Sequence, residues 1–257
     1  TVINFREMGK DRLAYWLANR TDQLTFLTLS GISYAFQNNG AARVGSPFPN
    51  LAFAADVSAP SAKRSLMWDG TSLAVSATGS ITTGYVPSYK MIVDLIAYAK
   101  ENYVKPLMEG GKEYYVLLVA PGTLAALKKD ADYQRAVVAV ATKSGADSPW
   151  FTGATVTVDG AVIHEHRLVY TTKGAASGSK WGSGGLVNGT RTLLCGAQAL
   201  GMADLGPAEW DEKTFQYGSQ QGINIDKMFG LLKPKFYSIY NGSVEDFGVV
   251  SVDHYLQ

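Results

Sequence analysis

The first segment with a clear hydrophobic period lies at the start of the chain. Within residues 4–29, apolar side chains recur at spacings of three, four and seven, at Leu13, Trp16, Leu17, Leu24 and Leu27. This spacing predicts one long amphipathic helix, with Asn4 as its N-cap and Gly31 as its stop. If the ring of Trp16 is fully buried on the apolar stripe, Trp16→Ala should cost about 3–5 kcal/mol.

The helical period is lost over residues 32–86. Gly, Ser, Ala, Thr and Pro dominate there, with prolines at positions 47, 49 and 60. The composition predicts an extended excursion of short strands and turns. A loop of this length usually carries function or packs on something, and a neighbouring subunit is one such surface.

A second helix and a strand–turn–helix unit are predicted next. Residues 87–104 place Met91, Leu95, Tyr98 and Ala99 on one helical face, with a proline in the first turn. The apolar run 114–119 is typical of a strand covered on both faces. A turn at residues 121–122 and a helix over 124–129, capped by Thr123, complete the unit.

Two hairpins are predicted in the second half. Residues 150–170 alternate between polar and apolar around Asp159-Gly160, and Asn241-Gly242 gives a second turn signal inside 223–254. Between them, the Gly- and Ser-rich stretch 172–185 is expected to be a mobile surface loop. Helices mixed with short scattered strands predict the α+β class.

Composition limits the partners of the chain. Of 257 residues, 46% are hydrophobic and 18% charged, and 23 basic against 22 acidic side chains give a net charge of +1. The low charge content favours a protein whose flanks are covered by neighbours. The chain has no cluster of basic residues, so we expect no sequence-specific nucleic-acid binding. It also has no apolar run of about 18 residues, so we expect no membrane span.

The stretch RTLLCGAQALG, residues 191–201, has to be tested for chemistry. Gly196 and Gly201 have the spacing of a phosphate-binding loop, but Met202 and Ala203 stand where lysine and a hydroxyl residue would hold the phosphate and magnesium. Cys195 is the single cysteine, which excludes an intrachain disulfide. In its apolar surroundings it is expected to be a small buried hydrophobe and no nucleophile.

The best metal candidate is His164 with His166. Residues two apart on a strand share a face, so both imidazoles could reach one ion, with His254 or a carboxylate as the third ligand. A metal-dependent hydrolase using His164 and His166 is therefore an open alternative, although two histidines at this spacing arise easily by chance.

Carboxylate pairs give no stronger signal for catalysis. Asp204 with Glu209, and Asp211 with Glu212, are expected to be solvated or inter-subunit charges. The sequences G-x-G-x-x-G, G-x-S-x-G and H-E-x-x-H do not occur. We therefore expect no enzyme: no catalytic residue, no cofactor-binding residue, no metal-binding residue and no cofactor.

The order of several segments resembles a known family. Arg-x-Leu-x-x-Gly-Ala-Gln-Ala lies at 191–199, Tyr-Gly-x-x-x-Gly-Ile at 217–223, Gly-x-x-Lys-x-x-Phe at 230–236 and Asp-Phe-Gly-Val at 246–249. In this order they resemble the C-terminal half of the phage capsid-like family, which includes the major capsid proteins of podophages of the coliphage N-four type. The first helix, FREMGKDRLAYWLANR, and the stretch GKEYYVLLVAPGTLAALKKD are also similar, so the resemblance covers nearly the whole chain.

The resemblance implies the tailed-phage major capsid fold, also called the HK-ninety-seven-like fold, with a long spine helix, a peripheral P domain and an axial A domain. By this analogy residues 1–87 are the first part of the P domain, made of the spine helix 4–29 and the excursion 32–86. Residues 88–225 are approximately the A domain, and residues 226–257 return to the P domain.

The implied function is that of a structural major capsid protein, which self-assembles into the icosahedral head enclosing the dsDNA genome of a tailed bacteriophage. Its partners would be copies of itself in hexamers and pentamers, with decoration, scaffold and portal proteins as further candidates. The chain would be assembled in the host cytoplasm and reside in the virion. A bacterial nanocompartment shell protein of the same fold is the second alternative.

Overall fold

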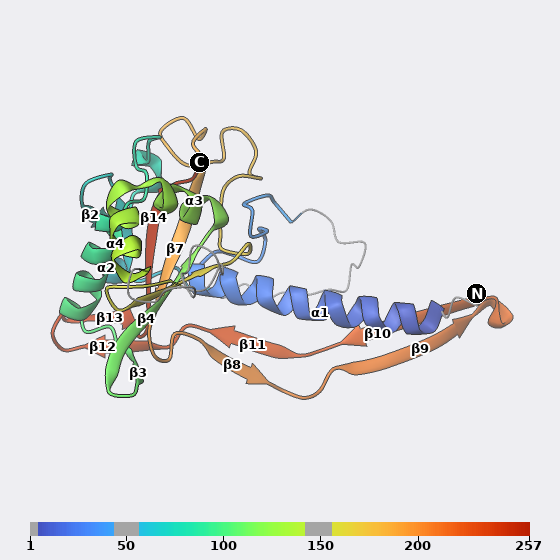
Figure 1. Ribbon diagram of the computed structural model, residues 1–257. Coiled ribbons are helices and arrows are strands. Elements are labelled where there is room, and N and C mark those ends of the chain that lie inside the picture. Colours follow the sequence, from blue (N-terminus) through green and yellow to red (C-terminus); the bar gives the residue numbers. More distant parts are fainter. Residues whose placement is uncertain (1–4, 44–56, 142–155) are drawn as a thin grey trace.

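A central mixed sheet organises the computed structural model, which describes residues 5–43, 57–141 and 156–257 (Figure 1). The helices are α1 (Phe5–Ser30), α2 (Tyr89–Glu101), α3 (Pro121–Lys129) and α4 (Ala131–Ala141). The strands are β1 (Ser65–Trp68), β2 (Leu73–Val75), β3 (Leu107–Glu109), β4 (Lys112–Val119), β5 (Val156–Val158), β6 (Ala161–Glu165), β7 (Gly189–Cys195), β8 (Gly201–Asp204), β9 (Glu209–Phe215), β10 (Gln220–Asp226), β11 (Phe229–Leu232), β12 (Lys235–Ser238), β13 (Ser243–Asp246) and β14 (Val249–Tyr255).

The sheet brings together strands from distant parts of the chain. Its order is β2-β1-β14-β7-β4-β6-β5, and β3 pairs with β4. The pairs β1–β14 and β4–β6 are parallel and the others antiparallel. All of β7, and all of β14 except its last residue, is buried. Covering on both faces explains why these strands show little alternation in sequence.

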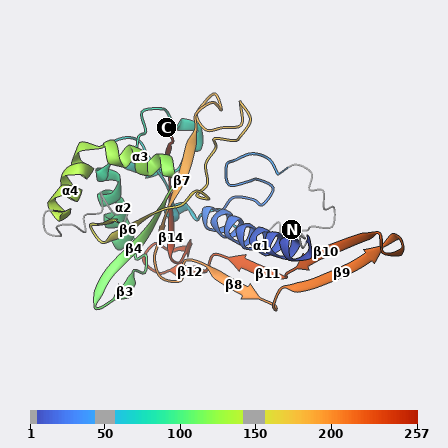
Figure 2. The same cartoon turned by 45° about the vertical axis from the view of Figure 1, so that its right-hand side comes forward.

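Helices cover the two faces of the sheet differently. On one face, the buried sides of α2, α3 and α4 pack against β1, β4, β7 and β14 in the main core, which includes Trp68, Leu95, Leu117 and Leu127. On the other face, the last turns of α1 contribute Leu24, Leu27 and Leu29 to smaller clusters. Figure 2 shows α1 leaving the sheet at an angle to the strands.

The remainder of α1 extends away from the sheet beside a long two-stranded ribbon, residues 201–232, made of β8 with β11 and β9 with β10 (Figure 1). Ile223 of the ribbon faces Gly9 of α1 so closely that a side chain at position 9 would press on it. Arg6 and Glu212 form a surface ion pair at 2.8 Å. The glycine inside the helix thus allows close packing of the ribbon.

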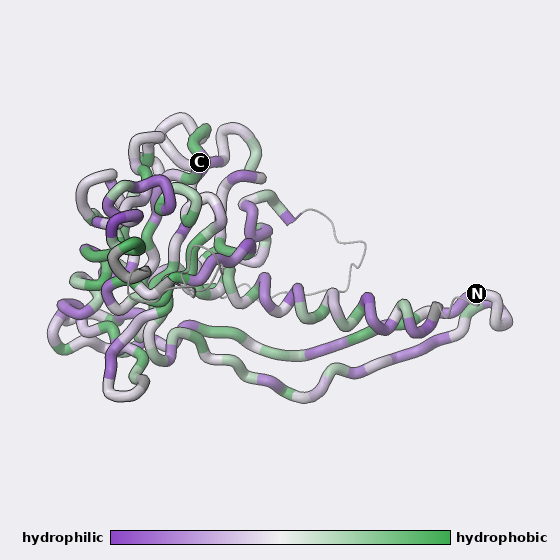
Figure 3. Tube along the Cα trace, viewed as in Figure 1, coloured by the Kyte–Doolittle hydropathy of each residue, from purple (hydrophilic) through white to green (hydrophobic). Residues whose placement is uncertain are grey.

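The ribbon differs in character from the rest of the molecule. None of residues 201–232 is buried, and residues 211–221 are all exposed. In Figure 3 most of β9 is coloured as hydrophilic, whereas hydrophobic segments gather around the sheet. Two-stranded ribbons are marginally stable alone in water, so this one depends on α1 and on any further surface it contacts.

Three elements expected from the sequence are confirmed. The first helix runs from Phe5 to Ser30 and is followed by Gly31 with φ +65°, whereas Asn4 lies outside the described residues. Asp159 and Gly160 both have positive φ, 49° and 84°, in the turn between β5 and β6. This is the type I′ geometry that Asp-Gly favours. Asn241 and Gly242 likewise lie in the turn of the hairpin β12–β13.

Other elements differ from those expected from the sequence. Helix α3 begins at Pro121 with Ala120 in the N-cap position, so Thr123 is a buried helix residue and not a cap. Proline suits the first helical turn, which is why no separate turn precedes it. Helix α2 begins at Tyr89, after Pro87. Strand β4 alternates between buried and half-buried positions from Tyr114 on, because its two faces are not equally covered.

The loop 172–185 is attached to the body at several points. Trp181 is 9% exposed and joins the cluster of α1 side chains, and Thr172 is buried. The Thr172 hydroxyl accepts a hydrogen bond from the N–H of Gly189 at 2.8 Å. The glycines and serines of this loop therefore lie in tight turns. The buried Trp181 packs the loop against the core.

The expected domain limits at 88–225 and 226–257 cut across the observed grouping of elements. Strands β9 and β10 lie beside α1, while β14 is inserted in the central sheet between β1 and β7. The division into P and A domains stays a prediction.

The exposure of Trp16 changes the expected result of its substitution. Trp16 is only half-buried, with the Arg20 guanidinium carbon 5.4 Å from its ring centroid. We expect Trp16→Ala to lower the free energy of unfolding of the isolated chain by about 1–2 kcal/mol, less than full burial would give. Urea unfolding measures this change. Leu27→Ala, at a fully buried position of the same helix, is the control and should cost about 2–5 kcal/mol. Equal losses would contradict this view of α1.

Candidate functional site

Two central strands of the sheet, β7 and β14, hold a pair of opposite charges inside the molecule. Arg191 on β7 and Asp253 on β14 form a bidentate ion pair, with Nε–Oδ1 at 2.7 Å and Nη2–Oδ2 at 2.8 Å. The side chains are 9% and 0% exposed. Because strands β7 and β14 are paired with these two residues opposite each other, the register itself places the charges in contact.

Further groups complete this buried pair. Nη1 of Arg191 donates to the carbonyl oxygen of Ser30, the last residue of α1, at 2.8 Å. The hydroxyl of Ser76 donates to Oδ2 of Asp253 at 2.6 Å. The guanidinium therefore holds the C-terminal end of α1 against strands β7 and β14. These contacts stabilise the fold.

The glycine after Cys195 has a packing role. The N–H of Gly196 donates to the carbonyl oxygen of Gly248 at 2.7 Å, and that of Ala197 donates to the carbonyl oxygen of Lys105 at 2.8 Å. A Cβ on residue 196 would collide with the carbonyl oxygen of Lys105. Gly201 belongs to β8. Gly196 thus permits close backbone approach, whereas Gly201 is a strand residue with room for a side chain, and the two do not form a phosphate-binding loop.

A second buried charge cluster was not anticipated from the sequence. Arg64 and Glu245 pair at 2.8 Å with both side chains fully buried. Beside them, Lys233 and Asp246 pair at 3.2 Å, and Asp246 also accepts a hydrogen bond from the N–H of Ser61. Lys233 and Asp246 are the charged residues named in the motifs of the last two family-like segments, so these segments hold β12 and β13 against the body.

The single cysteine is not a nucleophile. Cys195 is buried, and burial raises the pKa of its thiol to about 12. A thiolate is the reactive form, so this side chain is unreactive at neutral pH. It packs with Leu29, Leu193 and Val249, as the sequence analysis expected of a small hydrophobe.

The histidines do not form the proposed three-ligand site. The rings of His164 and His166 lie 6.3 Å apart, and the ring of His166 stacks on Phe26 with 4.5 Å between centroids. His254, offered by the sequence as a third ligand, is buried in β14 with both ring nitrogens engaged, by the Thr192 hydroxyl at 2.9 Å and by the Tyr255 carbonyl at 2.8 Å.

Because a carbonyl oxygen only accepts, Nδ1 of His254 carries the proton and Nε2 accepts from the Thr192 hydroxyl. Among the residues that the structure describes, no three His, Cys, Asp or Glu side chains converge as metal ligands. The hydrolase alternative gains no support.

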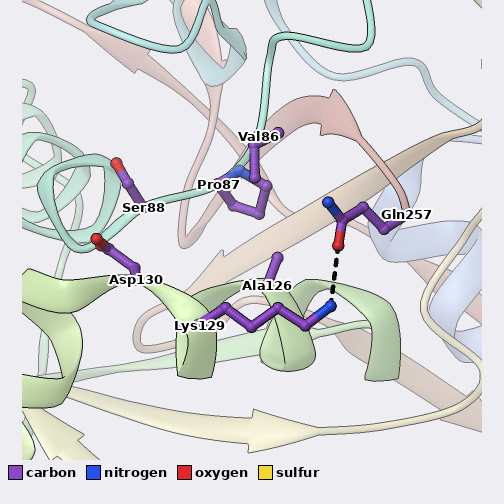
Figure 4. A pocket seen from close by; sticks show the side chains of 7 residues that line it. All are labelled: Val86, Pro87, Ser88, Ala126, Lys129, Asp130 and Gln257. Atoms are coloured by element: carbon purple, nitrogen blue, oxygen red, sulfur yellow. Dashed lines mark hydrogen bonds between the residues drawn. The ribbon is translucent and has the colours of Figure 1, made fainter.

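A shallow pocket of about 250 Å³ lies between α2, α3 and the chain's last residue (Figure 4). Its polar groups already serve the fold: Asp130 accepts a hydrogen bond from the N–H of Tyr89 at 2.6 Å, and Lys129 donates to Gln257 at 3.3 Å. It is lined by Val86, Pro87, Ser88, Ala126, Lys129, Asp130 and Gln257.

The acidic residues examined for acid–base chemistry lie on the ribbon surface. Asp204 pairs with Lys227 and Glu212 with Arg6, each at 2.8 Å. Hydrogen bonds, from Lys227 to Asp204 and from Trp210 and Arg6 to Glu212, lower the pKa of both carboxyl groups, which are partly exposed. They behave as surface charges, as expected.

The buried His254 predicts a pH dependence of stability. Burial lowers the pKa of His254 to about 4 from its ordinary value of 6.5. Between these values the unfolded chain binds a proton that the folded chain excludes, so the free energy of unfolding falls as the pH drops from 6.5 toward 4. We expect a loss of up to about 3 kcal/mol from this residue.

Urea unfolding at pH 7, 6, 5 and 4 measures the slope, and His254→Gln should flatten it whatever its effect at pH 7. Burial also lowers the pKa of His166, so this histidine makes a smaller contribution of the same sign to the pH dependence. His166→Gln should remove that contribution. An unchanged slope in His254→Gln would contradict the assignment.

These contacts define a class of protein. Arg191, Gly196 and Cys195 of the stretch tested for chemistry hold strands and helices together. The acidic pairs lie on the ribbon surface, and a long helix–ribbon arm extends into solvent. No helix within the described ranges is long and apolar enough to cross a membrane. The molecule is a structural subunit with large surface elements available to neighbours.

Comparison with known proteins gives the family. A family model described as "Phage capsid protein" matches residues 1–257, and the chain belongs to this family. It is 51% identical to the major capsid protein of Pseudomonas phage KPP25, over 98% of this chain and 68% of that protein. The chain is thus a structural capsid protein of a phage and a component of the virion, and not an enzyme.

Solved capsids share the fold at low identity. The capsid of Ralstonia phage GP4 matches with a TM-score of 0.75 and 23% identity, covering 100% of this chain and 69% of that one. The capsid of cyanophage Pam1 matches with a TM-score of 0.71 and 15% identity, covering 100% and 70%. The capsid fold expected from the resemblance is confirmed.

Proposed function

We propose that copies of this chain tile as hexamers and pentamers into an icosahedral head that encloses the dsDNA of a tailed phage. The observation that carries the proposal is the 51% identity to a phage major capsid protein over 98% of the chain. The exposed helix–ribbon arm supports it, because a subunit of a closed shell buries much of its surface against other copies.

The observed grouping supports a revised domain division. The P domain would consist of α1 with the ribbon 201–232, since the ribbon lies along α1 and both extend away from the sheet. The A domain would consist of the central sheet with α2, α3 and α4, including β1 and β14. This division replaces the expected limit between residues 225 and 226, which cuts β10 before its last residue and separates it from β11 in the same ribbon.

The remaining partners follow from the same role. A net charge of +1 supports a wall that encloses DNA without binding its sequence. Portal, scaffold and decoration proteins would contact the shell, and assembly would take place in the host cytoplasm before the genome enters. Many modest contacts between copies suffice for a stable shell, because closure multiplies them.

The test is the composition and symmetry of DNA-filled particles. Particles purified by density gradient should contain this chain as their most abundant protein, and a reconstruction should place it in both hexamers and pentamers. Nuclease treatment before and after opening the particles separates enclosed from adhering DNA. Particles in which the chain is a minor component, or absent from the wall, would overturn the proposal.

A further inference from the structure

An exposed apolar surface lies where the end of α2 meets the hairpin β12–β13. Its five large side chains are each more than half exposed: Tyr103 at 54%, Tyr237 at 63%, Ile239 at 78%, Tyr240 at 65% and Val244 at 58%. We refer to them as the aromatic patch. The rings of Tyr103 and Tyr240 stack with centroids 3.9 Å apart, and Tyr237 lies directly opposite Val244 in the hairpin.

The backbone at Tyr103 is unusual for a tyrosine. Helix α2 ends in a Schellman motif, in which the N–H of Tyr103 donates to the carbonyl of Lys100 at 3.2 Å and that of Val104 to the carbonyl of Ala99 at 2.9 Å. Tyr103 occupies the left-handed position of this motif with φ 57°. Glycine is the favoured residue there because it has no Cβ. A tyrosine held in this conformation contributes its ring to the surface at a cost to the folded chain.

The support beneath the patch is rigid. On the inner face of the hairpin, Glu245 is paired with Arg64 and both are fully buried. Ser238 is buried at the end of β12, and the carbonyl oxygen of Asp246 accepts from Nε of Arg64 at 3.1 Å. Since the hairpin is held on its inner face, the aromatic side chains on its outer face are already placed for a partner and lose little freedom on binding.

We propose that the aromatic patch is a contact surface for a second copy of this chain. Aromatic side chains such as the three tyrosines bury roughly 150–250 Å² each, and the isoleucine and valine of the patch bury less. The five side chains, each more than half exposed, therefore present on the order of 500 Å² of apolar surface. With an equal counterpart on the second copy, the contact buries about 1,000 Å², the size at which an interface becomes specific.

The chemistry of the patch agrees with this occupant. None of its five side chains is charged, so it suits an apolar protein surface and offers nothing to phosphate or to a cation. Tyrosine is among the residues that contribute most to protein interfaces. The proposal rests on the shell role proposed above, in which every copy must contact several others.

The first test separates assembly from folding. Tyr103→Gly removes the ring and relieves the left-handed backbone, so its urea midpoint should equal or exceed that of the unchanged protein. Its critical concentration for shell assembly should rise about tenfold, as expected for a central interface tyrosine. Tyr240→Ser should show the same rise. Leu186→Ser, at a side chain 66% exposed in the loop before β7, is the matched control and should assemble normally.

Crosslinking identifies the occupant. The chain has a single cysteine, which is buried, so Tyr240→Cys provides one accessible thiol for a maleimide–benzophenone reagent. Irradiation of assembled shells should join residue 240 to a peptide of a second copy. Normal assembly of both Tyr103→Gly and Tyr240→Ser, or crosslinks only to another protein, would overturn the proposal. The shell role itself would remain, since it depends on whether the unchanged protein forms the particle wall.

Discussion

Arg191→Met is expected to lower the free energy of unfolding by about 3–5 kcal/mol, enough to leave little folded protein in a marginally stable chain. The substitution keeps much of the apolar volume but leaves the Asp253 carboxylate buried without its partner. It also removes the donor to the Ser30 carbonyl, so the end of α1 loses its tie to the sheet. Urea unfolding followed by tryptophan fluorescence measures the loss.

Two controls make the Arg191 result specific. The double variant Arg191→Met with Asp253→Leu removes both charges, and it should recover part of the loss, because an apolar pair can replace a buried ion pair. Arg135→Met breaks the ion pair between Arg135 and Asp132, whose side chains are 80% and 69% exposed, respectively. It should lower the free energy of unfolding by less than about 1 kcal/mol. If Arg191→Met were as mild as Arg135→Met, the buried pair would not hold β7 to β14.

Trp68→Ala should produce a loss of similar size, about 3–5 kcal/mol. Trp68 is fully buried in the main core at the end of β1, and its Nε1 donates to the carbonyl oxygen of Val86 at 3.0 Å. Removing the indole leaves a cavity between the sheet and α2 and an unpaired carbonyl. Calorimetry or urea unfolding measures the effect, which should appear in the unassembled chain.

The matched control is another tryptophan. Trp210 lies half-exposed on β9, where Nε1 donates to Glu212, so Trp210→Ala should change the unfolding free energy by less than about 1 kcal/mol. Trp68→Phe should fall between the two, because it keeps most of the volume and loses only the hydrogen bond. Equal effects at positions 68 and 210 would show that the core has been wrongly placed.

The sequence predicted the elements that depend mainly on residues close together in the chain, such as helices and tight turns. The helix Phe5–Ser30 followed from its apolar period, and the hairpin at Asp159-Gly160 followed from the residues that tolerate positive φ. The ribbon 201–232 was not predicted as a unit. It buries no residue, and its turn at Gln216–Gly218 places two non-glycine residues, Gln216 and Tyr217, at positive φ, so neither hydrophobic alternation nor a standard turn signal marks it.

Ion pairs between residues far apart in the chain could not be predicted from the sequence, for a different reason. Nothing near Arg191 indicates that Asp253 will lie opposite it, because the register of β7 and β14 is set by the whole sheet. The same holds for Arg64 with Glu245. The expected apolar stripe of α1 was correct at Leu24 and Leu27 but overestimated burial at Trp16, since spacing predicts a face without predicting how much of it the fold covers.

The central claim is that this chain acts by tiling with copies of itself. Mass photometry of the purified protein across a range of concentrations, with electron microscopy of the same samples under assembly conditions, tests it most directly. The account predicts a sharp transition from small species to closed shells of uniform diameter above a critical concentration. A protein that remains monomeric at every concentration, with no shells on the grid, would contradict it.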